Sequence, residues 1–120
     1  MAGGRMRRVD EALREVLSDA IAKDLKDPRI GFVTVTAVNT SRDLRHARVY
    51  VSVLGDQRAR EQTIEGLRSA HGYLQGAIAS QLTLKRTPSL VFEYDETPER
   101  AARLTDLMRR GPDRPDGTDA

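Results

Sequence analysis

Apolar residues change their spacing several times along this chain of 120 residues, and each change marks the boundary of an expected element. Between Val9 and Leu25 they recur every three or four positions, which is typical of an amphipathic helix with one buried stripe. The segments 32–40 and 46–54 are rich in β-branched residues and alternate in polarity, as half-buried strands do. Because only the polar turn SRDLR separates them, the pattern predicts an antiparallel hairpin.

A second helical pattern runs from Ala59 to Leu82 and contains two glycines, Gly72 and Gly76. Each glycine costs about 1 kcal/mol relative to alanine inside a helix. Two explanations are open: the helix is interrupted, or the glycines let it pack closely against a sheet. We favour an interruption at Gly72 and close packing at Gly76.

A third strand pattern, SLVFEYD, occupies residues 89–95, and Thr97 followed by Pro98 then predicts the start of a short last helix. Each predicted strand has one apolar face, and each predicted helix has one apolar stripe. An α+β fold, with helices covering one face of a three-stranded sheet, buries all of them. We expect residues 1–6 to be a flexible N-terminus, residues 7–110 to be one domain, and residues 111–120 to be a disordered acidic tail.

The composition favours one domain and argues against several classes of protein. A hydrophobic content of 38% suffices for one core in a chain of this length. The absence of cysteine removes disulfides, thiolate metal ligands and thiol nucleophiles, and it fits a reducing compartment such as the cytoplasm. No segment has the ~20 apolar residues of a membrane span, and we expect no signal peptide. An aromatic content of 4% disfavours an RNA-binding surface of stacked rings.

Catalytic patterns are weak. His46 and His71 are the only histidines, and the carboxylates are scattered among basic residues instead of being grouped as metal ligands. His71 could form an acid–base set with Asp43 and Asp95, but nothing in the sequence brings them together. Neither a P-loop nor a dinucleotide-binding glycine motif is present. We therefore expect no enzyme, no catalytic residue, no cofactor and no metal site.

The charge distribution favours binding to phosphates. Residues 1–110 hold 19 basic and 15 acidic side chains, a balance of +4, whereas the last ten residues hold three Asp and one Arg. Binding to a phosphate backbone requires only basic side chains on one surface, with exposed amides or helix N-termini. Ordinary solvated charges are the alternative for each candidate. The candidates are Arg5, Arg7, Arg8, Arg42, Arg45, Arg48, Lys85 and Arg86.

Three short segments are each open to a structural and a functional interpretation. In DPRIG, Pro28 should end the first helix, Gly31 should permit an unusual turn or a close approach, and Arg29 could serve the fold or a ligand. In SRDL, we expect Ser41 and Asp43 to cap the turn. At the helix interruption, Ala70-His71-Gly72 could leave amides open to a phosphate, as the GXXG loop of a KH domain does.

Four sequence segments occur in this order: DPRIG, SRDLRHARVYVSVL, SAHGYLQ and LKRTPSLVFEYD. In these segments the chain resembles the bacterial ribosome-binding factor A family, and the resemblance runs from about Arg7 to Met108. The resemblance implies a KH-like fold of the type II order, α-β-β-α-(kink)-α-β plus the short C-terminal helix. An Ala-x-Gly kink replaces the GXXG loop in that family, which fits Ala70-His71-Gly72. The family commonly has an arginine where this chain has Gln75, so one of its basic contacts has no counterpart here.

The resemblance also implies a function. It predicts a monomeric, non-catalytic, cytoplasmic factor that binds free, immature small ribosomal subunits and aids late processing and folding of the small-subunit rRNA near its 5′ end. It implies a link to growth in the cold, and no membrane or small-molecule partner. The alternative is a general single-stranded nucleic-acid-binding module of KH type, although Ser69 replaces its first loop glycine. To the basic candidates for RNA binding we add Arg29, Ala70, His71, Gly72 and Tyr73.

Overall fold

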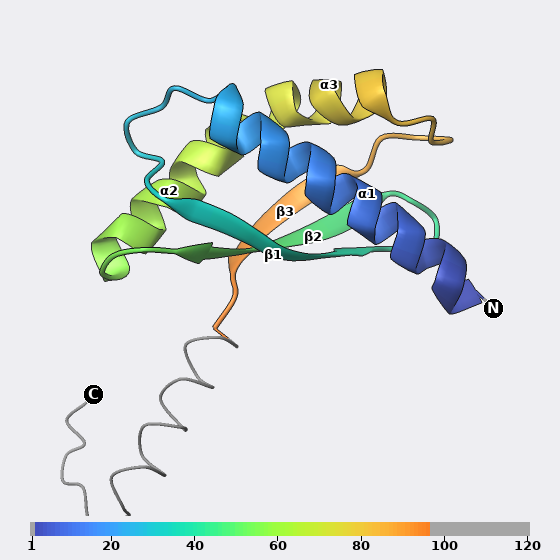
Figure 1. The fold of residues 1–120 in the computed structure, drawn as a ribbon, viewed down its shortest axis with the longest axis horizontal. Helices are drawn as coiled ribbons and strands as arrows, with labels where there is room; N and C mark the ends of the chain where they lie inside the picture. The colour runs from blue at the N-terminus through green and yellow to red at the C-terminus, as the bar shows by residue number, and fades with distance from the viewer. Residues whose placement is uncertain (1, 97–120) are drawn as a thin grey trace, which may run out of the picture.

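The computed structural model describes residues 2–96, and its element order agrees with the sequence prediction (Figure 1). The elements are α1 (Ala2–Lys23), β1 (Val33–Thr40), β2 (His46–Val53), α2 (Gln57–Ser69), α3 (His71–Gln81) and β3 (Ser89–Tyr94). This arrangement of three helices and a three-stranded sheet is the KH-like α+β fold predicted from the sequence. The short helix predicted after Thr97 and the tail 111–120 lie outside the described residues.

The first helix differs from the prediction at its start. Residues 1–6 were expected to be flexible, but α1 already begins at Ala2. Apolar periodicity detects a helix only where one face is buried, and that pattern starts at Val9. The preceding turns of α1 extend past the sheet, so the sequence pattern carries no signal for them (Figure 1).

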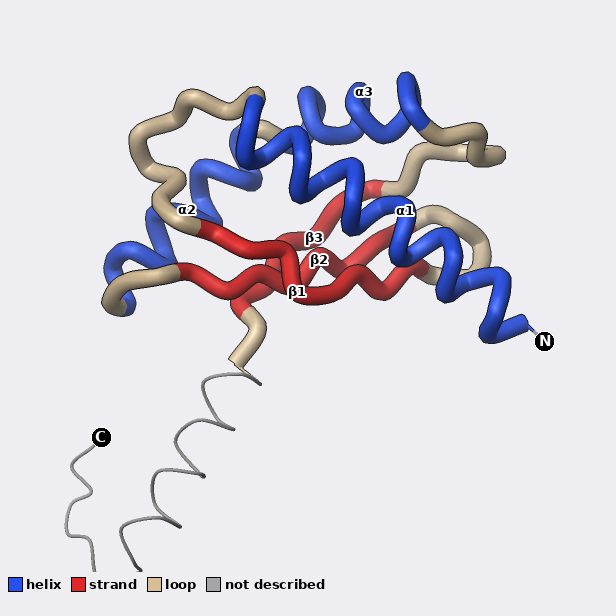
Figure 2. Tube along the Cα trace, in the orientation of Figure 1, coloured by secondary structure: helices blue, strands red, loops and turns tan. Residues whose placement is uncertain are grey.

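Strand β2 is the centre of a mixed sheet with the order β1-β2-β3. It pairs antiparallel with β1, from Val33 opposite Val53 to Thr40 opposite Ala47, which confirms the predicted hairpin. It pairs parallel with β3, because the chain crosses back over the sheet through α2 and α3. All three helices lie on the same side of the sheet (Figure 2).

The regular alternation predicted for β1 is interrupted by a bulge. The register with β2 shifts between Val35 and Ala37, so Thr36 is the extra residue. The Thr36 hydroxyl lies 2.6 Å from Asp95 Oδ2 and 3.2 Å from the carbonyl oxygen of Tyr50. Because one of these partners comes from beyond β3, the local pattern of β1 could not reveal the bulge.

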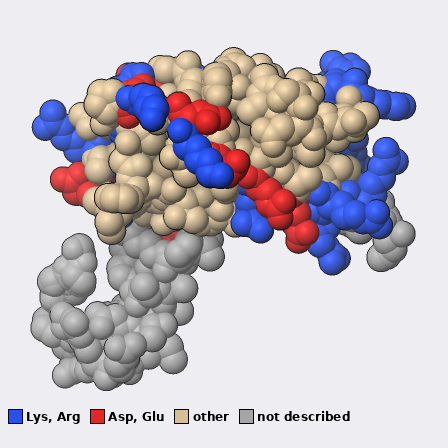
Figure 3. Space-filling model, turned by 45° about the horizontal axis from the view of Figure 1, so that its top comes forward, with Lys and Arg blue, Asp and Glu red and all other residues tan. Residues whose placement is uncertain are grey.

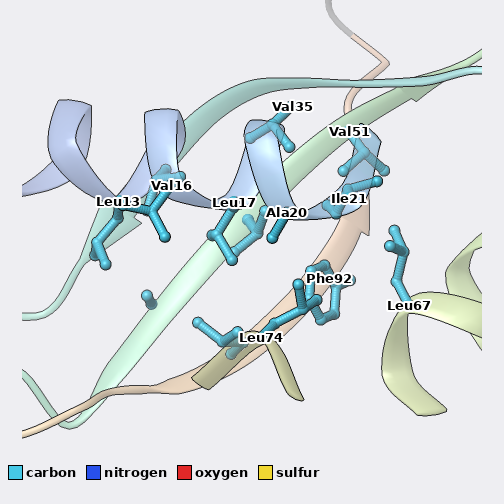
Figure 4. Close-up of a cluster of buried hydrophobic side chains, with 14 of the residues drawn as sticks. Leu13, Val16, Leu17, Ala20, Ile21, Val35, Val51, Leu67, Leu74 and Phe92 are labelled. Carbon is cyan, nitrogen blue, oxygen red and sulfur yellow. The ribbon is translucent and has the colours of Figure 1, made fainter. Parts of the chain in front are cut away.

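The core fills the space between the helices and the sheet (Figure 4). Its members are aliphatic apart from Phe92, as expected for a chain with few aromatic residues. Each element contributes the face that its apolar pattern predicted. Fully buried side chains include Leu13 and Leu17 from α1, Val49 and Val51 from β2, Leu67 from α2, and Leu74 and Ile78 from α3.

Candidate nucleic-acid interface

Three segments that are far apart in the sequence meet at one end of the molecule. Helix α1 begins there, the β1–β2 turn lies there, and α3 ends there before the loop to β3 (Figure 1). They surround a cavity of about 570 Å³, and four cationic side chains line it. We call these four residues the basic end: Arg5, Arg42, Lys85 and Arg86.

The basic end is suited to anions because its cations have few competing partners. All four side chains are exposed, and within residues 5–96 none of them belongs to an ion pair of the structure. Figure 3 shows Lys and Arg side chains gathered where α1 begins. Cations from three segments around one hollow create a local positive potential, although the net charge of the whole chain is only +2.

The other basic candidates do not line this cavity, and three of them have acidic neighbours. Arg45 Nε lies 3.5 Å from Asp43 Oδ2, and Arg48 Nε lies 3.7 Å from Glu93 Oε2. Arg29 Nη2 lies 2.6 Å from Asp27 Oδ2. Arg7 and Arg8 are exposed on α1, and Arg7 lines a shallow groove beside β1. The structure therefore distinguishes the four cations that line the cavity from the remaining candidates, and RNA contacts of both groups stay predictions.

The β1–β2 turn carries Arg42 to the basic end and is held by its own side chains. Ser41 Oγ donates to Asp43 Oδ1 at 2.7 Å and accepts the His46 N–H at 3.1 Å, while Arg45 N–H donates to Asp43 Oδ1 at 3.0 Å. These bonds confirm the predicted caps. The hydrogen bond from Ser41, followed by that from the Arg45 amide, lowers the pKa of Asp43. The turn is therefore built to keep one shape.

Leu44 is the unusual residue of this turn. Its φ of +61° lies in the left-handed region, which costs about 1–2 kcal/mol for a residue with a Cβ. Among the described residues other than glycine, it alone has a positive φ. Leu44 also lines the cavity at the basic end. Sequence reasoning missed this residue, because the strain becomes visible only in the backbone.

The DPRIG loop is part of the fold. Arg29 Nη2 donates to Ser69 Oγ at 3.0 Å, which connects the loop to the end of α2. Thr63, only 1% exposed, has its hydroxyl 3.4 Å from both the Gly31 N–H and the Arg29 carbonyl oxygen. The close approach expected at Gly31 is wrong, since a Cβ there would meet nothing within 4 Å and its φ is not positive. The loop instead approaches Gly66, where a Cβ would lie 2.7 Å from Ile30 Cγ1.

Asp27 should make the stability of this loop dependent on pH. Hydrogen bonds from the Arg29 side chain and amide lower the pKa of Asp27 to about 2. Because the unfolded value is about 3.9, this contribution is complete above that pH and is lost as the pH falls through about 2. Asp27→Asn should therefore flatten the fall of the urea midpoint between about pH 5 and pH 2.

The matched control for Asp27→Asn is Asp19→Asn, which removes a carboxylate from the exposed pair with Lys23. Exposed pairs of this kind contribute little to stability. The control should keep the wild-type pH profile. If Asp27→Asn also keeps that profile, the Asp27–Arg29 pair does not contribute to the acid stability of the fold.

The predicted helix interruption is confirmed, but its corner is Ala70. Ala70 separates α2 from α3 with φ −92° and ψ 11°. Gly72 lies in the first turn of α3, is exposed, and has open space where a Cβ would be. The packing explanation for Gly76 is wrong, because a Cβ there would also meet nothing within 4 Å in the part of the chain that the structure describes. Among the described residues, no side chain caps the start of α3, so its first amides are available to an anion.

Two residues around the kink hold the exposed edge of β3. Leu90 N–H donates to His71 Nε2 at 3.0 Å, and Gln75 Nε2 donates to the Pro88 carbonyl oxygen at 2.9 Å. His71 and Gln75 are one helical turn apart, so they reach two backbone groups on the same side of the strand. Unpaired groups on an edge strand otherwise invite pairing with another chain. Gln75, which the sequence analysis noted only as a missing basic contact, therefore has a structural role.

Tyr73, another kink candidate, also makes a contact within the chain. Its hydroxyl donates to Asp24 Oδ2 at 2.7 Å and raises the pKa of Tyr73, although the side chain is 54% exposed. This bond joins the start of α3 to the end of α1. Gly72, by contrast, is exposed and has open space where a Cβ would be.

Replacing His71 by alanine should destabilise the fold by about 1 kcal/mol, because the Leu90 N–H loses its partner. Amide hydrogen exchange gives the sharper measurement. The Leu90 amide should exchange faster in His71→Ala, while the Ser89 amide, which donates to the Arg45 carbonyl oxygen, should keep its protection. Equal acceleration at both amides would indicate general loosening and contradict a local role for His71.

The catalytic set considered from the sequence is not assembled. Asp43 lies in the β1–β2 turn, whereas Asp95 follows the far end of β3 and accepts a hydrogen bond from Thr36. Within the described part of the chain, no group of three or more His, Cys, Asp or Glu side chains could hold a metal ion. Across the same residues, no helix is both long and apolar enough to cross a membrane.

The element order, the mixed sheet and the kinked helix pair define a KH-like α+β domain with one strongly basic end. The family model described as ribosome-binding factor A matches residues 5–108. The chain belongs to the ribosome-binding factor A family.

Relatives support this assignment over most of the chain. The chain is 45% identical to ribosome-binding factor A from Halothermothrix orenii over 106 residues, which cover 88% of this chain and 87% of the relative. The crystal structure of ribosome-binding factor A from Thermus thermophilus matches with a TM-score of 0.67 and 29% identity, over 74% of this chain and 93% of that one. A homology model of the Thermus thermophilus factor, fitted into a cryo-EM map of its complex with the 30S particle, matches with a TM-score of 0.61 and 30% identity, over 72% of this chain and 90% of that one.

Proposed function

We propose that this protein is a non-catalytic assembly factor that binds immature small ribosomal subunits and aids late processing and folding of their rRNA near its 5′ end. The observation that carries the proposal is its membership of a family in which one relative has been fitted into a map of a 30S complex. The proposal extends to a cytoplasmic monomer that supports growth in the cold.

The basic end gives this proposal a physical basis. Phosphate contacts supply much of the affinity of a protein for RNA, and exposed cations make them. Arg5, Arg42, Lys85 and Arg86 are exposed around one cavity, and within residues 5–96 none of them belongs to an ion pair. The shape of the folded RNA, more than its base sequence, would then select the site. Release follows when the mature rRNA arrangement no longer presents that shape.

Co-sedimentation tests the proposal directly. Purified protein is added to small subunits from cells that lack it. It should sediment with these subunits at ~50 mM salt, and most of it should dissociate at ~200 mM salt, as counterion release predicts. Mature small subunits and large subunits should retain much less. Salt-insensitive binding, or equal binding to large subunits, would contradict the proposal. Tight binding to unrelated short RNAs would favour a general KH-type module instead.

The kink offers a second contact with RNA, and Gly72→Leu tests it. Since Gly72 is exposed with open space around it, leucine should fit and the domain should stay folded. Its side chain would stand beside the uncapped amides of α3, so we expect binding to small subunits to weaken about tenfold, as loss of roughly one charged hydrogen bond would cause.

The control for the kink is Ala79→Leu, which adds the same side chain to an exposed position nearer the end of α3. This variant should bind as the wild type does. If Gly72→Leu also binds normally in the co-sedimentation assay, the kink does not contact the RNA. Subunit binding would then depend on the basic end without the kink.

A further inference from the structure

The cavity at the basic end has an aliphatic floor as well as a cationic rim. Met6, Val9, Leu44 and Leu84 line it together with the four cations. Its volume of about 570 Å³ lies within the ~300–1,000 Å³ of pockets that hold a small organic ligand. A surface that contacts only phosphates needs no such floor. The lining therefore suits a ligand that carries both an apolar group and negative charge.

Leu44 supplies an independent indication. Its left-handed φ of +61° favours glycine or asparagine, yet the chain has leucine there. The turn is held by the Ser41 and Asp43 side chains and by the Leu44 backbone N–H, none of which requires a leucine side chain. Leu84 and Val9 pack against the core, whereas Leu44 is not among the residues that do. A strained residue whose side chain faces a cavity instead of the core points to a use in binding.

We propose that this cavity receives one unstacked nucleotide of the small-subunit rRNA. The aliphatic floor contacts the face of the base, and the cations hold the phosphates on its two sides. Unpaired nucleotides in loops and bulges can be splayed out in this way, and apolar side chains and arginine planes can stack on them. This inference rests on the proposed function and adds to it that the protein selects an unpaired nucleotide and not a continuous duplex.

The arrangement of charge favours a nucleotide within a strand over a free nucleotide. The cations come from α1, from the β1–β2 turn and from the α3–β3 loop, so they surround the opening. A strand that enters and leaves the cavity places one phosphate on each side, whereas a free nucleotide carries its charge at one end. Asp43 is the one carboxylate in the lining among the described residues, and its Oδ1 accepts from the Ser41 hydroxyl and the Arg45 amide.

Leu44→Asn tests the proposal without threatening the fold, because asparagine tolerates the left-handed conformation. The thermal midpoint of the variant should equal or exceed that of the wild type. The assay uses the full chain and small subunits purified from cells that lack it. Base-specific chemical reagents report contacts with bases, and hydroxyl radicals report contacts with the RNA backbone.

The wild type should protect one or a few adjacent bases together with the backbone around them. Leu44→Asn should lose the base protection, keep the backbone footprint, and bind about tenfold more weakly. Met6→Gln, which changes the floor from α1, should have the same effect. Leu54→Asn is the matched control, since Leu54 is 76% exposed and follows β2 at the end of the molecule away from the cavity.

Base protection that is unchanged in both Leu44→Asn and Met6→Gln would overturn the nucleotide pocket while leaving subunit binding intact. Loss of base protection in Leu54→Asn as well would also overturn it, because the effect would not belong to the cavity. A wild-type protein with no footprint on small subunits would contradict the proposed function itself. The two failures are therefore distinguishable in one experiment.

Discussion

Replacing Arg42, Lys85 and Arg86 together by glutamine should weaken binding to immature small subunits by about 100-fold. Each side chain should lose one charged contact with phosphate, which contributes ~1 kcal/mol or more, and every 1.4 kcal/mol changes the affinity tenfold. The slope of log affinity against log salt should also fall by about 2–3, since fewer counterions are released. A salt titration of co-sedimentation measures both quantities. The fold should be unaffected, because all three side chains are exposed.

A matched variant distinguishes the effect of where the charges lie from the effect of the net charge of the protein. Arg14, Lys26 and Arg58 are also exposed and stand outside the ion pairs of the described residues. Replacing these three by glutamine removes the same charge from other surfaces. We expect at most a few-fold loss of affinity and a nearly unchanged salt slope. Equal losses in the two triple variants would mean that binding follows overall charge, and the basic end would not be the RNA interface.

The sequence predicts the elements and their buried faces well, because a buried face carries apolar residues at the spacing of its helix or strand. In β2, the apolar residues from Ala47 to Val53 alternate, and all of them are buried. Features that depend on residues distant in the sequence produce no such local pattern. The bulge at Thr36 involves Asp95, and the sealing of the β3 edge involves His71. Neither partner can be assigned from the spacing of apolar residues.

The grouping of the basic candidates in space could not be predicted from the sequence, for a related reason. Composition identified basic candidates but could not group them, since Arg5 and Lys85 approach one cavity only through the path of α1 over the sheet. The sequence does carry a signal for which arginines form ion pairs. Arg29 and Arg45 each follow an aspartate by two positions, and both pairs form in the structure. A basic residue that close to a carboxylate could have been ranked lower as a phosphate ligand.

The environments of Gly66 and Gly76 could not be predicted from the sequence either, and replacing these two glycines should give opposite effects on stability. Gly66→Ala should lower the free energy of unfolding by about 1–3 kcal/mol, whereas Gly76→Ala should raise it by about 0.5–1 kcal/mol. Both substitutions gain the same helix propensity, so the difference between their effects, about 1.5–4 kcal/mol, reports sterics. The new Cβ at Gly66 would lie 2.7 Å from Ile30 Cγ1, whereas at Gly76 it meets nothing within 4 Å. Urea unfolding of the two variants measures the contrast.

A double-mutant cycle identifies the cause of the Gly66 effect. Ile30→Ala removes the Cγ1 atom that the new Cβ would meet, so Gly66→Ala should be much less harmful in that background. The cycle should give a coupling of about 1–3 kcal/mol, as residues in direct contact do. Additive effects would mean that the DPRIG loop moves away from α2 at little cost. Strong coupling would mean that the loop and the helix form one rigid unit, which fixes the direction in which α2 leads into the kink at Ala70.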